Sequence, residues 1–168
     1  MPETPSKSEH IPLLKQLLTK HRWAALATLD RHGYPEGAMV ALVMDEGLSE
    51  GYLHLSQLAS HTRNLLERPQ VALTISEADR GEGDPQQLAR LSLQGEVRRL
   101  APEDASYPTA RARYLATLPD AEMRFGFGDF QLFAFRWHSA RLVGGFGRAY
   151  SFRPQDLEKG AGGEVKPL

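Results

Sequence analysis

The chain has 168 residues, of which 41% are hydrophobic and 24% charged, and its formal net charge is -1. These values fit one globular domain that can bury a core without disulfides or metals, and they exclude a whole-molecule attraction to nucleic acid. The chain has no cysteine, which excludes disulfides, thiolate metal ligands and cysteine nucleophiles.

The first predicted element is an amphipathic helix near the N-terminus. Ile11, Leu14, Leu17 and Leu18 recur at helical spacing after Ser8, a candidate N-cap. No apolar signal-peptide core precedes it, and the longest apolar run, "AMVALVM", is too short to span a bilayer. We therefore expect a cytoplasmic protein with a flexible N-terminus over residues 1–7 and with no membrane or nucleic-acid partner.

Strands dominate the next part of the chain. "WAALATLD" and "AMVALVMD" on either side of "RHGYPEG" predict a hairpin, and "GYLHLS" predicts a third strand. A short helix begins near Ser60 and ends before Pro69, and the β-prone "QVALTIS" follows. After a charged loop, "ARLSLQGEVRRL" alternates between an apolar face and a polar face that includes Arg90.

The last part of the domain is predicted to hold a helix, in "APEDASYPTARARYLATLP", and two strands, "FQLFAFRWH" and "ARLVGGF". Both faces of "FQLFAFRWH" carry large apolar side chains, so helices or a second subunit must cover the outer face, and we predict a homodimer. The tail over residues 153–168 is rich in Gly and Pro and is expected to be flexible. Mostly sequential antiparallel strands favour a closed or nearly closed barrel over a doubly wound sheet.

The start of the short helix is the best local candidate for an anion site. A strand ends near Ser56 and the helix begins near Ser60, where free backbone N–H groups meet the positive end of the helix dipole. His61, Thr62 and Arg63 add donors or charge, so a phosphate could be held there. In the alternative interpretation, Ser60 only caps the helix, and the side chains of His61 and Arg63 face solvent. Arg90 would likewise only belong to the solvent-facing side of a sheet.

Other kinds of site receive little support from the sequence. No two of the six histidines have the i, i+4 spacing of a zinc enzyme, so no metal site is predicted. No G-x-S-x-G nucleophile elbow occurs, and no catalytic acid or base is assigned. "GGFGR", residues 144–148, lacks the Lys and Ser/Thr of a P-loop, and we interpret its glycines as permitting a bend or a close approach.

Four stretches of the chain together resemble one known family. They are "AALATLDRHGYPEGAMVALV", "YLHLSQLASHTRNLLERPQVALTI", "ARLSLQGEVRRL" and "GGFGRAY". In this order, over about residues 10–152, they are similar to the pyridoxamine 5'-phosphate oxidase-like FMN-binding split-barrel superfamily, and within it to the haem-utilisation (HugZ/HutZ-type) branch. The resemblance implies a mainly β domain with flanking helices over residues 8–152. Its fold would be a six-stranded antiparallel Greek-key split barrel that dimerises, with two FMN or haem sites at the subunit interface.

The resemblance also implies which residues contact the cofactor. A strand would lie along the flavin ring, the end of the next strand and the first turn of the short helix would follow it, and an arginine would reach across the dimer. The strand beside the flavin would contribute Met39, Val40 and Ala41, mostly through backbone contacts. The end of the next strand would contribute Leu55 and Ser56, the helix turn Ser60, His61 and Arg63, and the arginine would be Arg90. Oxidase relatives carry an Arg-Lys pair for the phosphate where this chain has Ser60 and His61, and Arg63 would supply the lost charge.

The predicted function is therefore an FMN-binding flavoprotein, an oxidoreductase of unknown substrate in which the flavin performs the redox chemistry. One alternative is a haem-binding or haem-degrading protein of the same fold, and another is a non-catalytic flavin-binding or interaction module. The C-terminal Arg and His pattern of true pyridoxamine phosphate oxidases is absent, so vitamin B6 synthesis is not predicted. Haem-degrading relatives carry an axial histidine in the C-terminal tail, whereas residues 153–168 contain none and His138 precedes the glycine motif.

Overall fold

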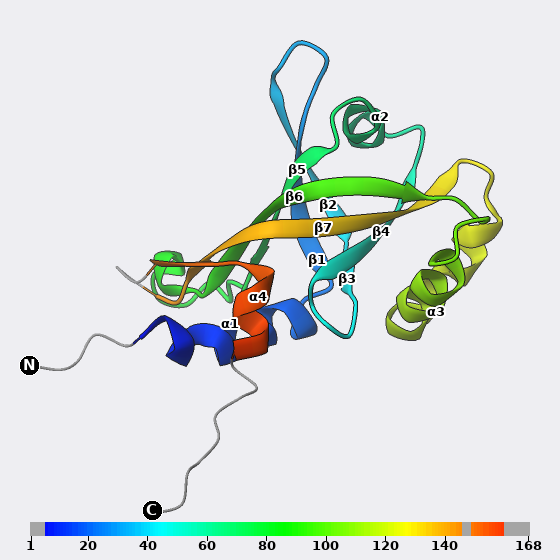
Figure 1. The fold of residues 1–168 in the computed structure, drawn as a ribbon. Helices are drawn as coiled ribbons and strands as arrows, with labels where there is room; N and C mark the ends of the chain where they lie inside the picture. Colours follow the sequence, from blue (N-terminus) through cyan, green and yellow to red (C-terminus); the bar gives the residue numbers. More distant parts are fainter. Residues whose placement is uncertain (1–5, 146–148, 160–168) are drawn as a thin grey trace, which may run out of the picture.

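A curled antiparallel β-sheet forms most of the molecule, and short helices lie at its two ends (Figure 1). The computed structural model describes residues 6–145 and 149–159. The strands are β1 (Trp23–Leu29), β2 (Pro35–Ala41), β3 (Val43–Met44), β4 (Glu50–Ser56), β5 (Gln70–Ser76), β6 (Arg90–Leu100), β7 (Phe130–Val143) and β8 (Ala149–Phe152). The helices are η1 (Lys7–His10), α1 (Ile11–Lys20), α2 (Ser60–Glu67), η2 (Pro85–Gln87), α3 (Tyr107–Thr117), η3 (Pro119–Gly126) and α4 (Pro154–Lys159).

The order of the strands explains why the sheet curls into a split barrel. It runs β2-β1-β5-β6-β7-β4-β3, with β8 paired to β7. β2 and β3 are separated only by Leu42, so both ends of this order lie in one continuous segment that pairs with β1 on one side and with β4 on the other. The mainly β architecture is therefore confirmed. Two short strands, β3 and β8, accompany the six long ones, and the last two predicted strands form the single 14-residue strand β7.

β7 is apolar on both faces because both faces pack within this chain. Phe133, Phe135 and Trp137 point into the barrel, where they join the main core. Leu132 and Ala134 point outward into a second core that Ala110 and Tyr114 of α3 complete, together with residues of β4 and η3. The sequence predicted that either helices or a second subunit cover the outer face of this strand. The structure shows that α3 covers it, so β7 does not itself require a dimer.

The prediction of a flexible C-terminal tail is wrong for residues 154–159. Residues 154–159 form α4, which lies beside α1 (Figure 1) and buries Leu157 in the main core. Lys7 of η1, at the end of the predicted flexible N-terminus, forms an ion pair with Asp156, with Nζ and Oδ2 2.7 Å apart. The two ends of the domain are therefore held together by contacts that include this ion pair and the packing of α4 beside α1. The remaining parts of both predicted flexible segments, residues 1–5 and 160–168, lie outside the described residues.

The glycine motif has a structural role where it is described. Gly145 has a φ of 122°, which L side chains rarely adopt, and a Cβ atom on Gly144 would lie 3.3 Å from the side chain of Leu13 in α1. The close approach therefore comes from a helix of the same chain. The rest of "GGFGR", residues 146–148, lies outside the described residues.

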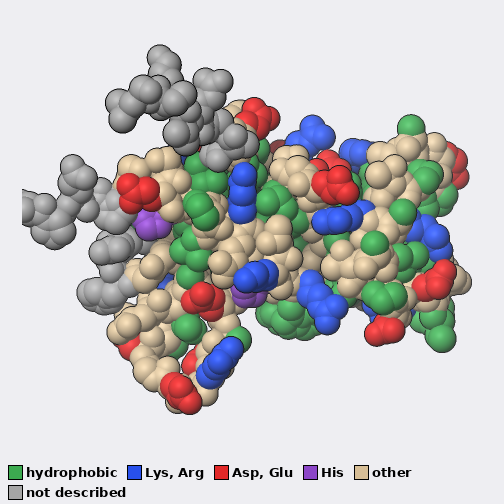
Figure 2. Space-filling model, turned by 90° about the horizontal axis from the view of Figure 1, so that it is seen from below, with side chains coloured by type: hydrophobic (Ala, Val, Ile, Leu, Met, Phe, Trp, Pro, Cys, Tyr) green, Lys and Arg blue, Asp and Glu red, His purple; other side chains and the backbone are tan. Residues whose placement is uncertain are grey.

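The surface mixes charges of both signs. Seen from below, Lys and Arg side chains are interspersed with Asp and Glu and with hydrophobic groups (Figure 2), as expected for a formal net charge of -1. Among the described residues, no helix is long and apolar enough to cross a membrane.

Candidate functional site

The first turn of α2 is occupied by a carboxylate. Glu36 of β2 accepts hydrogen bonds from the Ser60 hydroxyl and from the Asn64 amide, whose Nδ2 lies 2.9 Å from Oε2. The N-cap position belongs to Ala59, which offers no side-chain acceptor, so the prediction of Ser60 as the cap is wrong. The Ser60 side chain instead ties the helix to the β1–β2 hairpin.

The other residues of α2 that were predicted to bind a phosphate, Arg63 and His61, also interact with groups of this chain. The Arg63 guanidinium donates through Nη1 to the carbonyl oxygen of Leu58 at 2.9 Å. Burial lowers the pKa of His61 below its ordinary value, and the negative charge of Glu36 partly opposes this shift. His61 therefore favours the neutral form near neutral pH. A phosphate at this turn would face a carboxylate, and the residues present do not fit the FMN phosphate.

The predicted strand residues divide between the inside and the outside of the barrel. The side chains of Val40 and Leu55 are buried in the main core, so these residues could meet a ligand on the outer surface only through their backbone atoms, whereas the side chains of Met39 and Ala41 lie on the outer face of β2. Ser56 donates its hydroxyl proton to Asp129 at 2.5 Å and accepts from the backbone N–H of Leu58. Only some of the predicted residues on β2 and β4 therefore have side chains that a ligand on the outer surface could reach.

Arg90 lies at the other end of the sheet from α2. It pairs with Ser76, six positions along β5 from Gln70, where the segment after α2 enters the sheet. This separation is about 20 Å at the usual rise per strand residue. Its guanidinium donates to the carbonyl oxygen of Gln86 at 3.0 Å. Within one chain, Arg90 is therefore remote from the predicted residues of α2.

The outer face of the sheet holds a groove that the sequence did not indicate. A cavity of about 390 Å³ crosses β1, β5, β6 and β7 between the β1–β2 hairpin and the middle of β7. Leu29, Pro35 and Ala72 form apolar parts of its lining, and Gln94 and His138 contribute polar groups. We call this cavity the sheet groove. Its volume lies in the range of ligand pockets.

A β-bulge brings His138 to the sheet groove. Gln94 of β6 pairs with Ser139, but Gly95 pairs with Trp137, so His138 has no partner on β6. The strands approach so closely that a Cβ atom on Gly95 would lie 2.2 Å from the carbonyl oxygen of Arg136. Bulges re-aim side chains, and here the exposed imidazole lines the groove. The glycine inside "SLQGEVR" was the available sequence signal for the bulge, but nothing in the sequence linked it to a histidine.

A second cavity adjoins the first at the same histidine. It has a volume of about 330 Å³ and is lined by His138 together with Glu96, Arg136, Arg153 and Gln155. Two arginines therefore lie beyond the apolar part of the sheet groove. Across the described residues, no three His, Asp or Glu side chains are placed to hold a metal ion by themselves.

Comparisons with known proteins agree with this architecture. Residues 5–157 match the family model described as CREG, beta-barrel. The chain belongs to the CREG β-barrel family. This CREG-type barrel is 30% identical over 158 residues to the protein named "Heme oxygenase HutZ" of Vibrio cholerae, a match that covers 87% of the chain and 82% of the relative. It is also 32% identical over 120 residues to the chloroplastic "Non-canonical heme oxygenase HOZ" of Arabidopsis thaliana, but spans only 34% of that protein's length.

Solved structures support the same family and fold. A heme binding protein from Mycobacterium smegmatis is 29% identical with a TM-score of 0.77, covering 94% of this CREG-type barrel and 62% of that chain. A Clostridium acetobutylicum protein of the pyridoxinephosphate oxidase family is 14% identical with a TM-score of 0.65, over 90% of this chain and 99% of that one, and shows the fold alone. The predicted resemblance to the split-barrel superfamily and its haem-utilisation branch is confirmed. The matching relatives favour the haem alternative over FMN.

Proposed function

We propose that this protein binds haem in the sheet groove and acts on it as a haem oxygenase-type oxidoreductase. The observation that carries the choice of haem over FMN is the Glu36 carboxylate, which accepts from Ser60 and Asn64 where a flavin phosphate would have to bind. Two relatives named as heme oxygenases support the same choice.

Electrostatics explains why Glu36 discriminates between the two cofactors. The FMN phosphate carries close to two negative charges at neutral pH, and a carboxylate in hydrogen-bond contact with the same helix turn would repel it. Haem has no phosphate, and it presents a flat apolar ring, two carboxylates at one edge and an iron that accepts imidazole. The sheet groove offers apolar side chains and one exposed histidine, so its residues fit haem.

The residues of the chain would position haem and limit its contact with water. Leu29, Pro35 and Ala72 provide the apolar contact surface, and Gln94 is oriented by the Ser139 hydroxyl, which donates to its Oε1 at 3.2 Å. When bound, the haem iron supplies the redox chemistry. The protein contributes orientation and an electrostatic environment, and an external reductant supplies the electrons.

Titration of the purified protein with hemin and, separately, with FMN tests the proposal. We expect a Soret band that saturates at one hemin per chain, no quenching of FMN fluorescence, and loss of the Soret band when ascorbate and oxygen are added. Tight FMN binding without hemin binding would contradict the choice of haem. A Soret band that persists under turnover conditions would contradict the oxidoreductase activity and leave a haem carrier.

A charge-removing variant tests the role of Glu36. Glu36→Gln should raise FMN affinity by about tenfold, because it removes one repulsive charge from the α2 turn, and should leave hemin affinity unchanged. Glu67→Gln, an exposed residue at the other end of α2, is the matched control and should change neither affinity. Equal FMN affinities in both variants would show that Glu36 does not discriminate against the phosphate.

We also propose a homodimer that forms through the outer face of β1 and β2. Trp23 and Leu29 of β1 and Met39 of β2 are exposed on this face, with the small residues Ala25 and Ala27 between them. Large apolar groups around small ones favour close packing of a second sheet. Because this face is continuous with the sheet groove, a second copy would cover the open side of the haem.

A further inference from the structure

We infer that a small pocket at the end of β6 binds a monocarboxylate with an apolar body, and that Arg99 binds its carboxylate group. The pocket has a volume of about 200 Å³, and we call it the strand-end pocket. Gln131, which lines it, lies seven positions along β7 from His138 of the sheet groove, roughly 20 Å at the usual rise per strand residue. The strand-end pocket is therefore a separate site, and the inference does not depend on haem binding.

The pocket exists because β6 ends before β7 does. The last pair between these strands joins Leu100 to Leu132, whereas β7 begins at Phe130 and pairs there with β4. Pro102 follows the end of β6, and proline has no backbone N–H with which to extend the pairing. The chain then leaves the sheet and enters α3 at Tyr107, so that a gap remains beside the start of β7.

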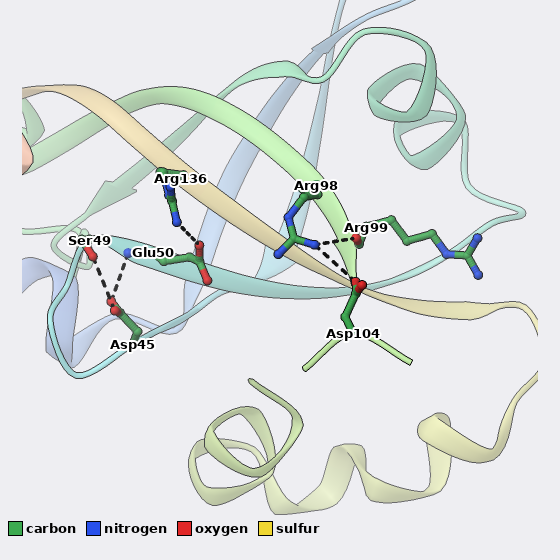
Figure 3. Close-up of polar contacts among 7 residues, drawn as sticks. All are labelled: Asp45, Ser49, Glu50, Arg98, Arg99, Asp104 and Arg136. Carbon is green, nitrogen blue, oxygen red and sulfur yellow. Dashed lines mark hydrogen bonds and ion pairs between the residues drawn. The ribbon is translucent and has the colours of Figure 1, made fainter. Parts of the chain in front are cut away.

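Arg99 brings a positive charge that this chain does not neutralise. Figure 3 shows Arg98 and Arg136 pointing toward Asp104 and Glu50, with closest N–O distances of 3.3 and 3.4 Å, whereas the Arg99 guanidinium points away from both acids. Among the described residues, no carboxylate lies within ion-pair distance of Arg99. It is also the only charged one of the described residues that line the pocket. The lining therefore carries one net positive charge.

Gln131 orients the Arg99 guanidinium. In the orientation that satisfies the donors around it, the amide oxygen of Gln131 accepts from Nη2 of Arg99 at 3.1 Å and from Nε at 3.3 Å. The donors of Nη1 stay available for a carboxylate oxygen. The carboxylate of Asp129, which precedes Phe130, accepts instead from the Ser56 hydroxyl at 2.5 Å and does not line the pocket.

The size and the walls of the pocket define the class of ligand. A volume of about 200 Å³ equals roughly seven water molecules at about 30 Å³ each, so only a small molecule fits. Leu100 and Leu132 are buried and Phe130 is half-buried, so they form apolar walls, and Tyr107 adds a phenol hydroxyl that can donate to an oxygen atom. One arginine matches the single charge of a carboxylate better than the two charges of a phosphate.

Titration with benzoate, followed by two-dimensional ¹H–¹⁵N nuclear magnetic resonance without haem, tests this site. We expect saturable shifts of the amide signals of Leu100, Gln131 and Leu132. Benzamide has the same ring but no charge, and it should bind the wild type at least about tenfold more weakly. Acetate, which lacks the ring, should also bind more weakly, because it gains no contact with the apolar walls.

Two neighbouring arginines provide a variant and its control. Arg99→Gln should bind benzoate at least about tenfold more weakly, because it loses a charge-assisted hydrogen bond. Arg98→Gln removes the same charge one residue away, from a side chain that pairs with Asp104 and does not line the pocket, and it should bind benzoate as the wild type does. Both side chains are exposed, and the dispersion of the amide signals checks that both variants are folded.

The possible outcomes decide the inference without reference to haem. It is wrong if the wild type shows no saturable shifts at the pocket, or if Arg99→Gln binds benzoate as tightly as the wild type. An equal loss of affinity in Arg98→Gln and Arg99→Gln would mean that benzoate responds only to the general surface charge, and the site would be rejected. Equal affinities for benzoate and benzamide would refute the role of the carboxylate.

Discussion

His54 carries a buried imidazole that the proposed haem site does not use. It lies on the outer face of β4 beneath η3, where its ring stacks on that of Phe125 with centroids 3.8 Å apart. Its Nδ1 atom is buried without a hydrogen-bond partner. Burial lowers its pKa to about 4, and the positive charge of Arg124 adds to this effect. The fold therefore keeps His54 neutral at physiological pH.

This burial predicts an acid-dependent loss of stability. The ordinary pKa of 6.5 applies in the unfolded chain and a value of about 4 in the fold, so the unfolded chain binds the proton more tightly. The stabilisation is complete above pH 6.5 and is lost as the pH falls through 4. We expect this residue to account for roughly 2–3 kcal/mol of the free energy of unfolding over that range.

Urea denaturation at pH 7 and pH 4 measures this contribution. His54→Phe keeps an aromatic ring against Phe125 and should reduce the loss of stability between the two pH values by that amount. His32→Phe, at an exposed position, should behave as the wild type. The same pH dependence in wild type and His54→Phe would contradict the assignment to His54.

The pairing of β6 and β7 shows how two elements create a feature that neither has alone. β6 alternates regularly as the sequence predicts, with Leu91, Leu93 and Val97 buried. Its register with β7 shifts at Gly95, and that shift leaves His138 unpaired. A glycine is required there because the backbone of β7 occupies the space that a side chain would need.

Gly95→Ala should therefore destabilise the fold by roughly 2–4 kcal/mol, since its Cβ atom would overlap the carbonyl oxygen of Arg136 and force β6 and β7 apart. Chemical denaturation measures the change. Gly126→Ala is the matched control, because no atom lies within 4 Å of the added Cβ, and it should change stability by less than about 0.5 kcal/mol. Equal free energies of unfolding for the two variants would show that the backbone of β7 can shift to accommodate the added Cβ atom without loss of stability.

At the scale of the whole molecule, the outer surface of β1 and β2 belongs to a face of the barrel that no described helix covers. Helix α3 covers the outer surface of β4 and β7, and α1 contributes to the core at one end of the barrel. Met39 is half exposed on the uncovered face. A homodimer would bury it together with Trp23.

A charge introduced on this face should prevent dimerisation. We expect sedimentation equilibrium to show a dimer for the wild type and a monomer for Met39→Glu, because a carboxylate buried without a partner costs several kcal/mol. Met123→Glu places the same charge on η3, where the methionine is 76% exposed, and should remain dimeric. A monomeric wild type, or a dimeric Met39→Glu, would overturn the proposed interface.

Part of the fold and little of the site could be predicted from particular residues. The spacing of Leu14, Leu17 and Leu18 indicated the buried face of α1, and the polar turn of "RHGYPEG" indicated the β1–β2 hairpin. The interpretation of residues 153–159 as flexible failed because composition does not reveal that Leu157 reaches the core. The predicted phosphate turn failed because its decisive neighbour, Glu36, lies 24 residues before Ser60.

The sequence by itself determined the alternation of strand faces, the helical spacing of α1 and the family resemblance, because periodicity and motifs are properties of neighbouring residues. Only the tertiary structure decided which side chains face one another across the sheet. It placed Glu36 at the α2 turn, covered β7 with α3 and brought His138 to the apolar groove. These are contacts between distant segments, and they depend on strand register, which a single bulge changes by one residue.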